Sequence, residues 1–534
     1  MNKVRIIAIF SLAVLLGACS SRELNTKTSN TTGWNYFDER TTNFEALADI
    51  DAGIPTGMVP IQGGTFMIGE HDEFITAPRD NSQRSVTVTS FYMDKYEVTN
   101  LNWREYLHWM EIVFGQTAPE LVQKVLPDST VWREELAYND PYVENYFRHP
   151  AFSFYPVVGV SWTQAMAYAK WRTDRVNELA LIKAGAIATP DFQGLQATDD
   201  EGYKDEWETE TGYYMDEFEV PDPEDPTNTI TMYRPSYDYI RDKFVFSTEK
   251  YLTVGDYQPE FGRRPKTDSY GNERKVNRTD GILVAGYRLP TEAEWEFAAY
   301  APVAGEDGLT IEGKIYPWSG YHPRNLTNKQ RGQLQANFVR GRGDMMGVSG
   351  ALNDRYVITA PVDEYFPNDF GLYNMAGNVN EWVLDVYRET SNQEVSEYNS
   401  FRGNIYMKPK MTVNEDGAKV YAIDSVGGIE LEFSGDDDKR DYKDGDFASL
   451  LDTDYPLDTV GIENLSEVKT DPTDILAPRI TKNTRVYKGG SWRDRIYWLN
   501  PSTRRYLDQD KSASTIGFRC AMSTVGNQLD NQIQ

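Results

Sequence analysis

The apolar and polar positions along the chain predict several amphipathic helices, the clearest of them over residues 100–114. There, apolar side chains recur at the three- and four-residue spacing of one helical face. They are Trp103, Tyr106, Leu107, Met110, Val113 and Phe114. Thr99 or Asn100 can cap this helix, because a short polar side chain accepts a hydrogen bond from a free backbone N–H of the first turn. A stripe of this kind indicates a face packed on the core rather than a cofactor surface.

Two further helix starts are marked by capping boxes, in which a Ser or Thr stands three residues before a Glu or Gln. Ser161 with Gln164 forms one of them, and Thr291 with Glu294 forms the other. Each pair can satisfy two backbone N–H groups at a helix start. We therefore expect helices to begin at these two points.

Short strands are predicted at both ends of the central part of the chain. Residues 57–69 contain two apolar runs around Gly63–Gly64, and residues 85–91 alternate apolar and polar side chains as a half-buried strand does. Near the other end, Val486–Tyr487 and residues 516–520 are short strand signals. The Gly489–Gly490 pair between them allows backbone turns that other residues rarely adopt.

Four sequence blocks resemble the formylglycine-generating enzyme, or sulfatase-modifying factor, family. They are the opening block at 57–100, R-L-P-T-E-A-E-W-E at 288–296, G-L-Y-N-M-A-G-N-V-N-E-W at 371–382, and K-G-G-S-W … R-R … G-F-R-C at 488–520. Matched stretches cover residues 57–171, 286–387 and 485–522. The resemblance implies an α+β, C-type-lectin-like domain with little regular secondary structure.

The same resemblance implies a fold that has lost its chemistry. Family enzymes oxidise a substrate cysteine with a copper-binding pair of cysteines after the G-G-S segment, and the matching positions here are Asp494 and Leu499. A soft metal requires thiolate ligands, so we expect no copper and no catalytic residue. Asp494 as a replacement catalyst is the alternative, but a lone carboxylate among arginines is more often an ion-pair partner, and acid–base catalysis needs a second positioned group.

The family also has two structural calcium sites, and oxygen-bearing side chains are retained at the matching positions. Calcium prefers such hard oxygen ligands, from side chains and from backbone carbonyls. The resemblance assigns one site to Asn374, Gly377, Val379 and Glu381, and the other to Asn337, Phe338, Asp354 and Tyr356. The alternative is that these residues fix loops by hydrogen bonds without a metal. Asn380 stands where the family usually has tryptophan.

Two long insertions interrupt the matched blocks, at about 173–284 and 388–484. Residues 199–225 hold thirteen carboxylates against one lysine, which is typical of a solvated loop. We expect an insertion with some local structure but no independent domain. Aromatic residues in both insertions suggest an interface for partner proteins. They are Tyr213, Tyr214, Tyr233, Tyr237, Tyr239, Tyr398, Phe401 and Tyr406.

The amino terminus reads as a lipoprotein signal peptide over residues 1–18. Lys3 and Arg5 precede the apolar run 6–16, which is too short to span a bilayer. It ends in L-G-A-C, so Cys19 is the expected lipidation site; an ordinary signal peptide with a chance cysteine is the alternative. No aspartate follows Cys19, which favours the outer membrane. We expect a tether and aromatic preamble at 19–56, the domain at 57–523 and a polar tail at 524–534.

Composition excludes several classes of function. The net charge of −28 argues against nucleic acid, whose phosphates attract lysine and arginine. Four scattered histidines lack the spacing of a zinc site. With Cys19 acylated, the second and last cysteine, Cys520, has no partner for an intramolecular disulfide.

A narrower resemblance points to the gliding-motility lipoproteins of Bacteroidota. It rests on Trp34-Asn35-Tyr36, on residues 171–178 and on Y-K-G-G-S-W-R-D-R-I-Y-W-L at 487–499. It implies a non-catalytic outer-membrane lipoprotein that faces the periplasm and contacts other proteins of the gliding and type IX secretion machinery. The alternative is a ligand-binding or residual enzymatic module that uses the former active-site cleft.

Overall fold

The computed structural model describes residues 28–29, 31–35, 54–70, 81, 83–222, 228–254, 266–267, 273–302, 314–326, 329–341, 355–387, 406–413, 417–434 and 483–524. Cys19, Asp354, Tyr398 and Phe401 lie outside these residues. In the described part of the chain, no helix is both long and apolar enough to cross a membrane.

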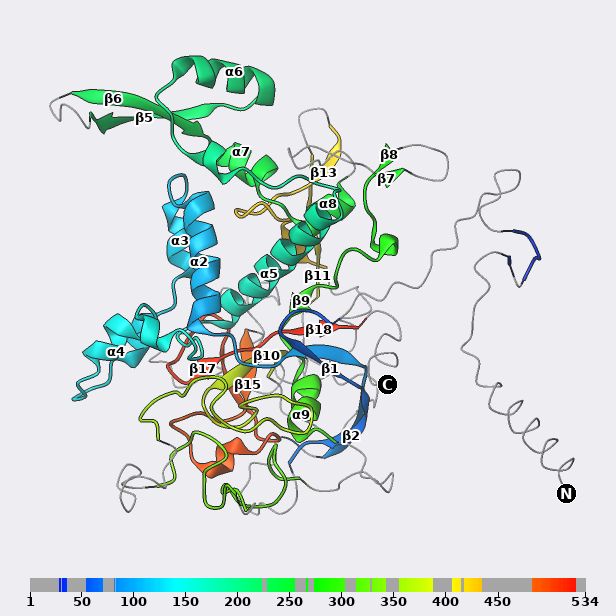
Figure 1. Cartoon of the computed structure of the whole chain (residues 1–534), viewed down its shortest axis with the longest axis vertical. Coiled ribbons are helices and arrows are strands. Elements are labelled where there is room, and N and C mark those ends of the chain that lie inside the picture. The colour runs from blue at the N-terminus through cyan, green and yellow to red at the C-terminus, as the bar shows by residue number, and fades with distance from the viewer. Residues whose placement is uncertain are drawn as a thin grey trace, which may run out of the picture.

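Two four-stranded sheets form the centre of the domain (Figure 1). The first has the order β1 (Met58–Ile61), β4 (Phe91–Asp94), β18 (Ala521–Ser523) and β9 (Tyr287–Arg288), with all neighbours antiparallel. The second has the order β16 (Arg505–Asp508), β15 (Thr484–Lys488), β10 (Asn380–Val386) and β17 (Ile516–Gly517). β10 and β17 are parallel, whereas β15 is antiparallel to both of its neighbours. Together with the helices below, these sheets give the expected α+β architecture.

The strand predicted at 85–91 is two strands in the structure. β3 (Arg84–Val88) pairs with β2 (Gly64–Ile68), and β4 begins at Phe91 and pairs with β1. The chain changes sheets at Thr89–Ser90, where the Ser90 hydroxyl accepts a hydrogen bond from the Gly63 N–H at 3.0 Å. The alternating pattern therefore spans two strands that belong to different sheets.

All three predicted helices are present, and each begins at its predicted cap. α2 (Asn100–Phe114) is capped by Thr99, α5 (Trp162–Lys183) by Ser161 and α9 (Glu292–Tyr300) by Thr291. In each case the side chain three residues on bonds back to the cap residue, which completes the capping box. The six apolar residues predicted to face the core in α2 are all buried.

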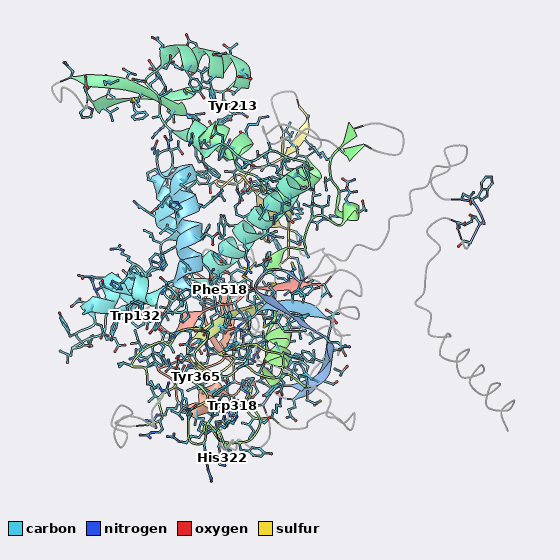
Figure 2. The ribbon with its side chains drawn as sticks, in the orientation of Figure 1. Trp132, Tyr213, Trp318, His322, Tyr365 and Phe518 are labelled. Carbon is cyan, nitrogen blue, oxygen red and sulfur yellow. The ribbon has the colours of Figure 1, made fainter. Side chains whose placement is uncertain are left out.

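Shorter helices follow α2 on one side of the molecule. They are α3 (Pro119–Val125), η1 (Ser129–Trp132), α4 (Asp140–Asn145) and η2 (Pro150–Phe152). These four helices form a lobe, and Trp132 lies in it, to the left of the sheets in Figure 2. Its ring stacks on Trp492 with centroids 5.9 Å apart, which joins the lobe to the loop that follows β15.

The main core lies between the first sheet and the helices α2 and α5. Trp103 of α2 stacks on Tyr168 of α5 at 5.4 Å and meets the edge of Phe518 at 5.9 Å. Phe518 lies at the foot of both helices (Figure 2). Trp382 of β10 is also fully buried, and its indole N–H donates to the Val160 carbonyl at 3.1 Å. A second core packs α9 against β2, β3 and β15.

The first insertion has local structure, as expected, but the described part of 199–225 is a helix and a hairpin rather than the solvated loop that its acidic composition favours. α6 (Glu201–Thr211) and the hairpin of β5 (Met215–Pro221) and β6 (Thr229–Pro235) form an arm that projects from the top of the molecule (Figure 1). Asp200 caps α6, Gly212 ends it with a φ of +72°, and Trp207 packs edge-on against Tyr239 at 4.7 Å. Capping and one aromatic contact outweigh the acidic composition.

The rest of this insertion lies on both sides of the arm, with η3 before it and the other elements between it and α9. It comprises η3 (Phe192–Leu195), α7 (Tyr237–Tyr239), the π-helical η4 (Ile240–Phe244), α8 (Thr248–Thr253), β7 (Lys266–Thr267), β8 (Glu273–Arg274) and η5 (Arg278–Asp280). A small core of Leu181, Ile187, Phe246, Tyr251 and Val276 packs α8 against the end of α5.

The second insertion contributes a β-ribbon in which β11 (Met407–Pro409) pairs with β14 (Leu431–Phe433) and β12 (Met411–Val413) with β13 (Lys419–Tyr421). A tight turn between β13 and β14 reaches back to the domain. There Asp424 pairs with Lys170 of α5 at 2.9 Å, and the Ser425 carbonyl accepts from the Tyr237 hydroxyl at 2.6 Å. The two insertions therefore contact each other.

The aromatic residues predicted as interface anchors serve mostly as internal packing. Tyr233 and Tyr239 are buried, and Tyr213, at the base of the arm in Figure 2, packs on Tyr239 at 5.5 Å. Tyr237 and Tyr406 are half-buried. Tyr214, 79% exposed, has the accessibility that an interface anchor needs. In the preamble, Trp34 is 60% exposed.

Candidate functional site

The loop after β15 contains Asp494 and Leu499, which stand at the two positions where the family resemblance predicts cysteines. The shape of this loop depends on two glycines. Gly489 and Gly490 have φ angles of +102° and +71°, which favour glycine. A Cβ on Gly490 would also lie 2.8 Å from the Trp498 carbonyl oxygen. The loop turns back through η9 (Ile496–Leu499) into β16.

The first residue of the K-G-G-S-W motif fixes this loop to α9. Lys488 has a fully buried side chain, and its Nζ lies 2.7 Å from Glu296 and 3.1 Å from Glu292. Arg504 contacts Glu292 as well, at 2.7 Å. Burial alone would raise the pKa of Glu292, but the charges of Arg504 and Lys488 outweigh it and lower that pKa to about 2.

Asp494 is held by hydrogen bonds from three side chains. Its carboxylate accepts from both terminal nitrogens of Arg505 at 2.8 Å, and from the Ser491 hydroxyl at 2.6 Å. The Ser491 N–H at 2.9 Å and the Asn380 amide at 3.4 Å complete the set. Arg505 donates to the Asn380 side-chain oxygen too, so these residues form one closed network.

The chemistry of Asp494 is that of a permanent anion. Burial would raise its pKa, but the hydrogen bonds and charge of Arg505, with those of Ser491 and Asn380, more than compensate and lower it. Its side chain is only 16% exposed. A carboxylate that is fully ionised and bonded by this many donors is a poor general base, because its proton affinity is low and its lone pairs are occupied. The expectation of an ion-pair partner among the arginines is met by Arg505.

Leu499 and Cys520 provide no reactive thiolate near Asp494. Leu499 is fully buried in an apolar cluster with Phe338 and Ala376. Cys520 is the cysteine that the described part of the chain contains, and it is buried beside Asp94, whose carboxylate accepts its backbone N–H at 3.0 Å. Burial, and then the charge of Asp94, raises the pKa of the Cys520 thiol to about 12. A protonated, buried thiol is neither a nucleophile nor a copper ligand.

The residues of the first predicted calcium site lie close to a buried acid that the sequence analysis did not single out. Glu97 precedes α2, and its Oε2 accepts from the amides of Asn374 at 2.9 Å and Asn378 at 2.8 Å. Glu381 is bound instead by Arg519 at 2.5 and 2.6 Å and by the Trp295 indole at 2.7 Å. Glu97 belongs to the E-V-T-N block by which the family is identified, so its place in a motif was the available signal.

Two oxygens at this site have no hydrogen-bond donor among the described residues. They are Oδ1 of Asn374 and Oε1 of Glu97, and both are buried. Burial, and then the nearby charge of Glu381, raises the pKa of Glu97 to about 8. Buried acceptors without donors are costly and are uncommon in native proteins. A bound cation would supply what they lack, so the residues present fit calcium, although its binding stays a prediction.

The second predicted site shares this property and adjoins the first. Asn337 donates to the Ile358 carbonyl at 2.8 Å, while its buried Oδ1 has no donor within the described residues. Phe338 is buried, and burial followed by the charge of Glu364 raises the pKa of Tyr356 to about 12. Asp354, the fourth residue assigned to this site, lies outside the described residues.

Asn378 connects the two predicted calcium sites. Its backbone N–H donates to the Asn337 carbonyl at 2.9 Å, and its side-chain oxygen accepts from the Ala360 N–H at 2.7 Å. Gly377 beside it has a φ of +79°, and a Cβ there would lie 2.4 Å from the Asn337 carbonyl oxygen. The two segments pack so closely that a shift at one site must move the other.

Most of the predicted site residues lie on two adjacent segments, 337–338 and 374–381, which are joined by the hydrogen bond from the Asn378 N–H to the Asn337 carbonyl. They are Asn374, Gly377, Val379, Glu381, Asn337 and Phe338. Asp494 is next to them, because the Asn380 amide donates to its carboxylate. Within the described residues, the predicted calcium sites included, no group of three or more His, Cys, Asp or Glu side chains is placed to hold a metal ion.

Comparison with known proteins identifies the family. The sequence profile described as "Sulfatase-modifying factor enzyme 1-like domain" matches residues 46–524. The formylglycine-generating enzyme of Mus musculus is 25% identical over 333 residues, which cover 62% of this chain and 58% of that protein. That of Thermomonospora curvata is 44% identical over 101 residues, covering 19% and 28%.

Similar proteins from two organisms, Bos taurus and Mus musculus, are named as inactive. "Inactive C-alpha-formylglycine-generating enzyme 2" of Bos taurus is 38% identical over 104 residues, which cover 19% of this chain and 28% of that protein. Among solved structures, PvdO from Pseudomonas aeruginosa aligns with a TM-score of 0.37 and 16% identity, over 88% of this chain and 94% of that chain. The chain spans a little over half the length of the mouse enzyme that it matches. The profile match covers most of the sequence, so this chain belongs to the sulfatase-modifying factor enzyme 1-like family.

Proposed function

We propose that this protein is a non-catalytic scaffold of its family that acts through protein–protein contacts. The observation that carries the proposal is the state of Asp494, a partly buried anion satisfied by Arg505, Ser491 and Asn380. At the other expected cysteine position, Leu499 is packed in an apolar cluster. Where an oxidase of this family needs two thiolates, this chain has a structural ion pair and a core residue. The bovine relative that is named as inactive supports the proposal, because its name indicates a similar protein without the reaction.

We further propose that the scaffold is an outer-membrane lipoprotein of the GldJ and GldK type, anchored through Cys19. Its motif at 487–499 and the L-G-A-C sequence at the amino terminus support this assignment. In this proposal the chain faces the periplasm and belongs to the gliding and type IX secretion machinery. Its partners are other proteins of that machinery.

Structural calcium belongs to the same proposal. Asn374 and Glu97 would hold one ion, together with the backbone at Gly377 and Val379. Glu381, which the resemblance also assigns to this site, would have to leave Arg519 and Trp295, which bind both of its oxygens, to join them. The buried oxygens of Asn374 and Glu97 that have no donor among the described residues support this placement. The ion would neutralise buried negative charge and fix the loops that surround Asp494, without taking part in a reaction.

The insertions are the proposed contact surfaces for partners. They pack on the family core and on each other through Lys170–Asp424 and Tyr237–Ser425, so they present a defined shape. The arm of α6, β5 and β6 stands away from the rest of the molecule (Figure 1). Tyr214 of the arm is exposed. Exposed aromatic residues on a rigid, projecting element are suited to contact another protein.

An oxidase assay tests the central proposal. The purified chain is incubated with copper, a reductant and a sulfatase-type peptide that contains cysteine, and the product is examined by mass spectrometry for the aldehyde. The expected result is no conversion by the wild type. The double variant Asp494→Cys/Leu499→Cys is the matched control. It places cysteine at both expected positions and shows whether the rest of the cleft still supports the reaction. Conversion of the peptide by the wild type would overturn the proposal.

A further inference from the structure

A closed turn between Thr28 and Asn35 precedes the domain and has no role in the proposed function. The Ser29 N–H donates to the Trp34 carbonyl at 2.8 Å, and the Gly33 N–H donates to the Ser29 carbonyl at 2.9 Å. Thr28 and Asn35 form an antiparallel bridge that closes the open end. These contacts give the turn, the short dark-blue segment at the right of Figure 1, a definite shape of its own.

Trp34 is the most exposed tryptophan of this chain. All twelve tryptophans lie in the described residues, and the other eleven are buried or half-buried. Trp34 is 60% exposed, although its backbone carbonyl is held within the turn. A tryptophan side chain buries roughly 150–250 Å² when it is covered, so an exposed one forgoes a large apolar contact. The turn therefore presents an aromatic ring for which we expect a covering surface.

The sequence around the turn favours a lipid surface as that covering. Residues 28–37 contain no charged side chain, in a chain that is 25% charged and has a net charge of −28. Anionic lipids repel carboxylates, so a segment of this acidic chain that touches a bilayer has to be free of them. Tryptophan is enriched at bilayer surfaces, because its apolar ring enters the headgroup region while the indole N–H stays hydrated. Tyr214 of the arm, by contrast, is exposed within the acidic stretch 199–225, which suits a protein rather than a lipid surface.

The expected lipid anchor keeps the turn within reach of the bilayer. Trp34 follows Cys19 by fifteen residues, which extend over at most roughly 50 Å. Anchoring at Cys19 makes the contact between turn and lipid an intramolecular step, so even a weak contact is populated. Stable attachment of a lipidated protein commonly combines the acyl chain with a second membrane contact.

We propose that this turn rests on the bilayer surface and places the Trp34 ring among the lipid headgroups, as a second membrane contact beside the lipid at Cys19. The inference rests on the proposed function, because the anchor brings the turn to the bilayer. Its consequence is a shorter tether. The domain, whose first strand begins at Met58, is held by the residues after Trp34 rather than by the whole stretch from Cys19. The scaffold is thereby kept close to partners in the membrane.

A fluorescent reporter beside Trp34 tests the inference in the full lipidated chain, reconstituted into vesicles of phosphatidylethanolamine and phosphatidylglycerol. The reporter is an NBD group attached to Asn35→Cys, at a position where the side chain is exposed. Cys19 is blocked by its lipid, and the buried, protonated thiol of Cys520 does not react with the label. A doxyl group on the lipid quenches a reporter in the headgroup region, whereas iodide quenches a reporter in water. The expected result is quenching by the doxyl lipid and protection from iodide.

Variants that carry the same reporter locate the contact. Trp34→Ser is expected to lose quenching by the doxyl lipid and to become accessible to iodide. Trp34→Tyr, which keeps an aromatic ring with a polar end, is expected to retain both properties of the wild type. Tyr214→Ser is the matched control, because it removes an exposed aromatic residue of the arm and is expected to change neither signal. Thermal melts confirm that the domain of each variant is folded.

Three outcomes overturn the inference. They are a wild-type reporter that iodide quenches and the doxyl lipid does not, equal signals from the wild type and Trp34→Ser, and protection from iodide in isolated outer membranes but not in pure vesicles. The third outcome would show that a membrane protein covers the turn.

Flotation of the vesicles separates these results from a failure of the anchor. A chain that floats with the vesicles while its reporter stays in water refutes the inference and leaves the proposed function intact. A chain that does not float refutes anchoring at Cys19, and the inference with it.

Discussion

Replacing Asp494 with asparagine separates a structural role from a catalytic one. The change keeps the size of the side chain and leaves an acceptor for Ser491, but it removes the charge that faces Arg505 at 2.8 Å. The Arg505 side chain is only 20% exposed. In the variant its positive charge would stay in this largely buried position without the Asp494 carboxylate beside it. Breaking a buried ion pair from one side costs about 3–5 kcal/mol. Because both side chains keep some contact with solvent, the expected loss is about 3 kcal/mol.

The assay is thermal unfolding of the purified chain, with and without the substitution. The entropy of unfolding grows with chain length, by roughly 2.1 cal/mol/K per residue, so in a domain this large each kcal/mol lowers Tm by about 1 °C, and a decrease of about 3 °C is expected. Arg493→Gln is the matched control, because Arg493 lies in the same loop as Asp494 but pairs with Glu134 at the surface, where the two side chains are 53% and 35% exposed. That change is expected to cost less than about 1 kcal/mol.

The dependence on pH provides a second readout. The folded-state pKa of Asp494 is lowered, so the stability that it contributes is present above its unfolded pKa and is lost as the pH falls through the folded value. The difference in Tm between wild type and Asp494→Asn should therefore shrink in acid. A variant as stable as the wild type at neutral pH would refute the structural role and favour a strained, functional carboxylate.

Four further predictions concern calcium, the buried acid Glu97, the arm and the anchor. Chelation should lower the Tm of the wild type by an amount that corresponds to about 2.7 kcal/mol at a hundredfold excess of calcium over Kd, and Glu381→Ala should blunt this response. In the chelated protein the raised pKa of Glu97, about 8, should make stability decrease as the pH rises from 5 to 8, because the folded state then binds the extra proton; calcium should abolish that decrease. Trp207→Ala should release α6 from Tyr239 and raise protease cleavage in the arm, with a change in Tm of less than about 2 °C. Cys19→Ala should move the protein out of the outer-membrane fraction, and unchanged fractionation would contradict anchoring by a lipid.

The features predicted most accurately from the sequence depend on a few neighbouring residues. Thr99, Ser161 and Thr291 each sit three residues from their capping partner, so both halves of the interaction are visible in the chain. The turn at Gly489–Gly490 is visible for the same reason, because the backbone angles themselves demand glycine. The ion pair of Asp494 was predicted in kind from the arginines around it, of which Arg505 lies eleven residues away.

The features that were missed depend on contacts between distant segments or on a competition between effects. Glu97 lies 277 residues from Asn374, so nothing in its own neighbourhood shows that it becomes a buried acid at a predicted metal site. In α6 the acidic composition favoured a loop, but the Asp200 cap and the Trp207 contact favoured a helix and prevailed. The sequence predicts Tyr233 and Tyr239 as interface anchors, but both are buried, because their burial depends on the path of the arm, which composition does not reveal.

The position of the last strands affects the order in which this protein can fold. β18, at Ala521–Ser523, lies between β4 and β9 in the first sheet, and β17, at Ile516–Gly517, completes the second. During synthesis or export the amino end of the chain emerges first. Both sheets therefore stay incomplete, with open edges, until the last tenth of the chain has emerged. Open sheet edges invite pairing with other chains. We expect truncation before residue 516 to yield aggregation or degradation rather than a smaller stable domain, and the nascent chain to need protection from a chaperone for most of its passage.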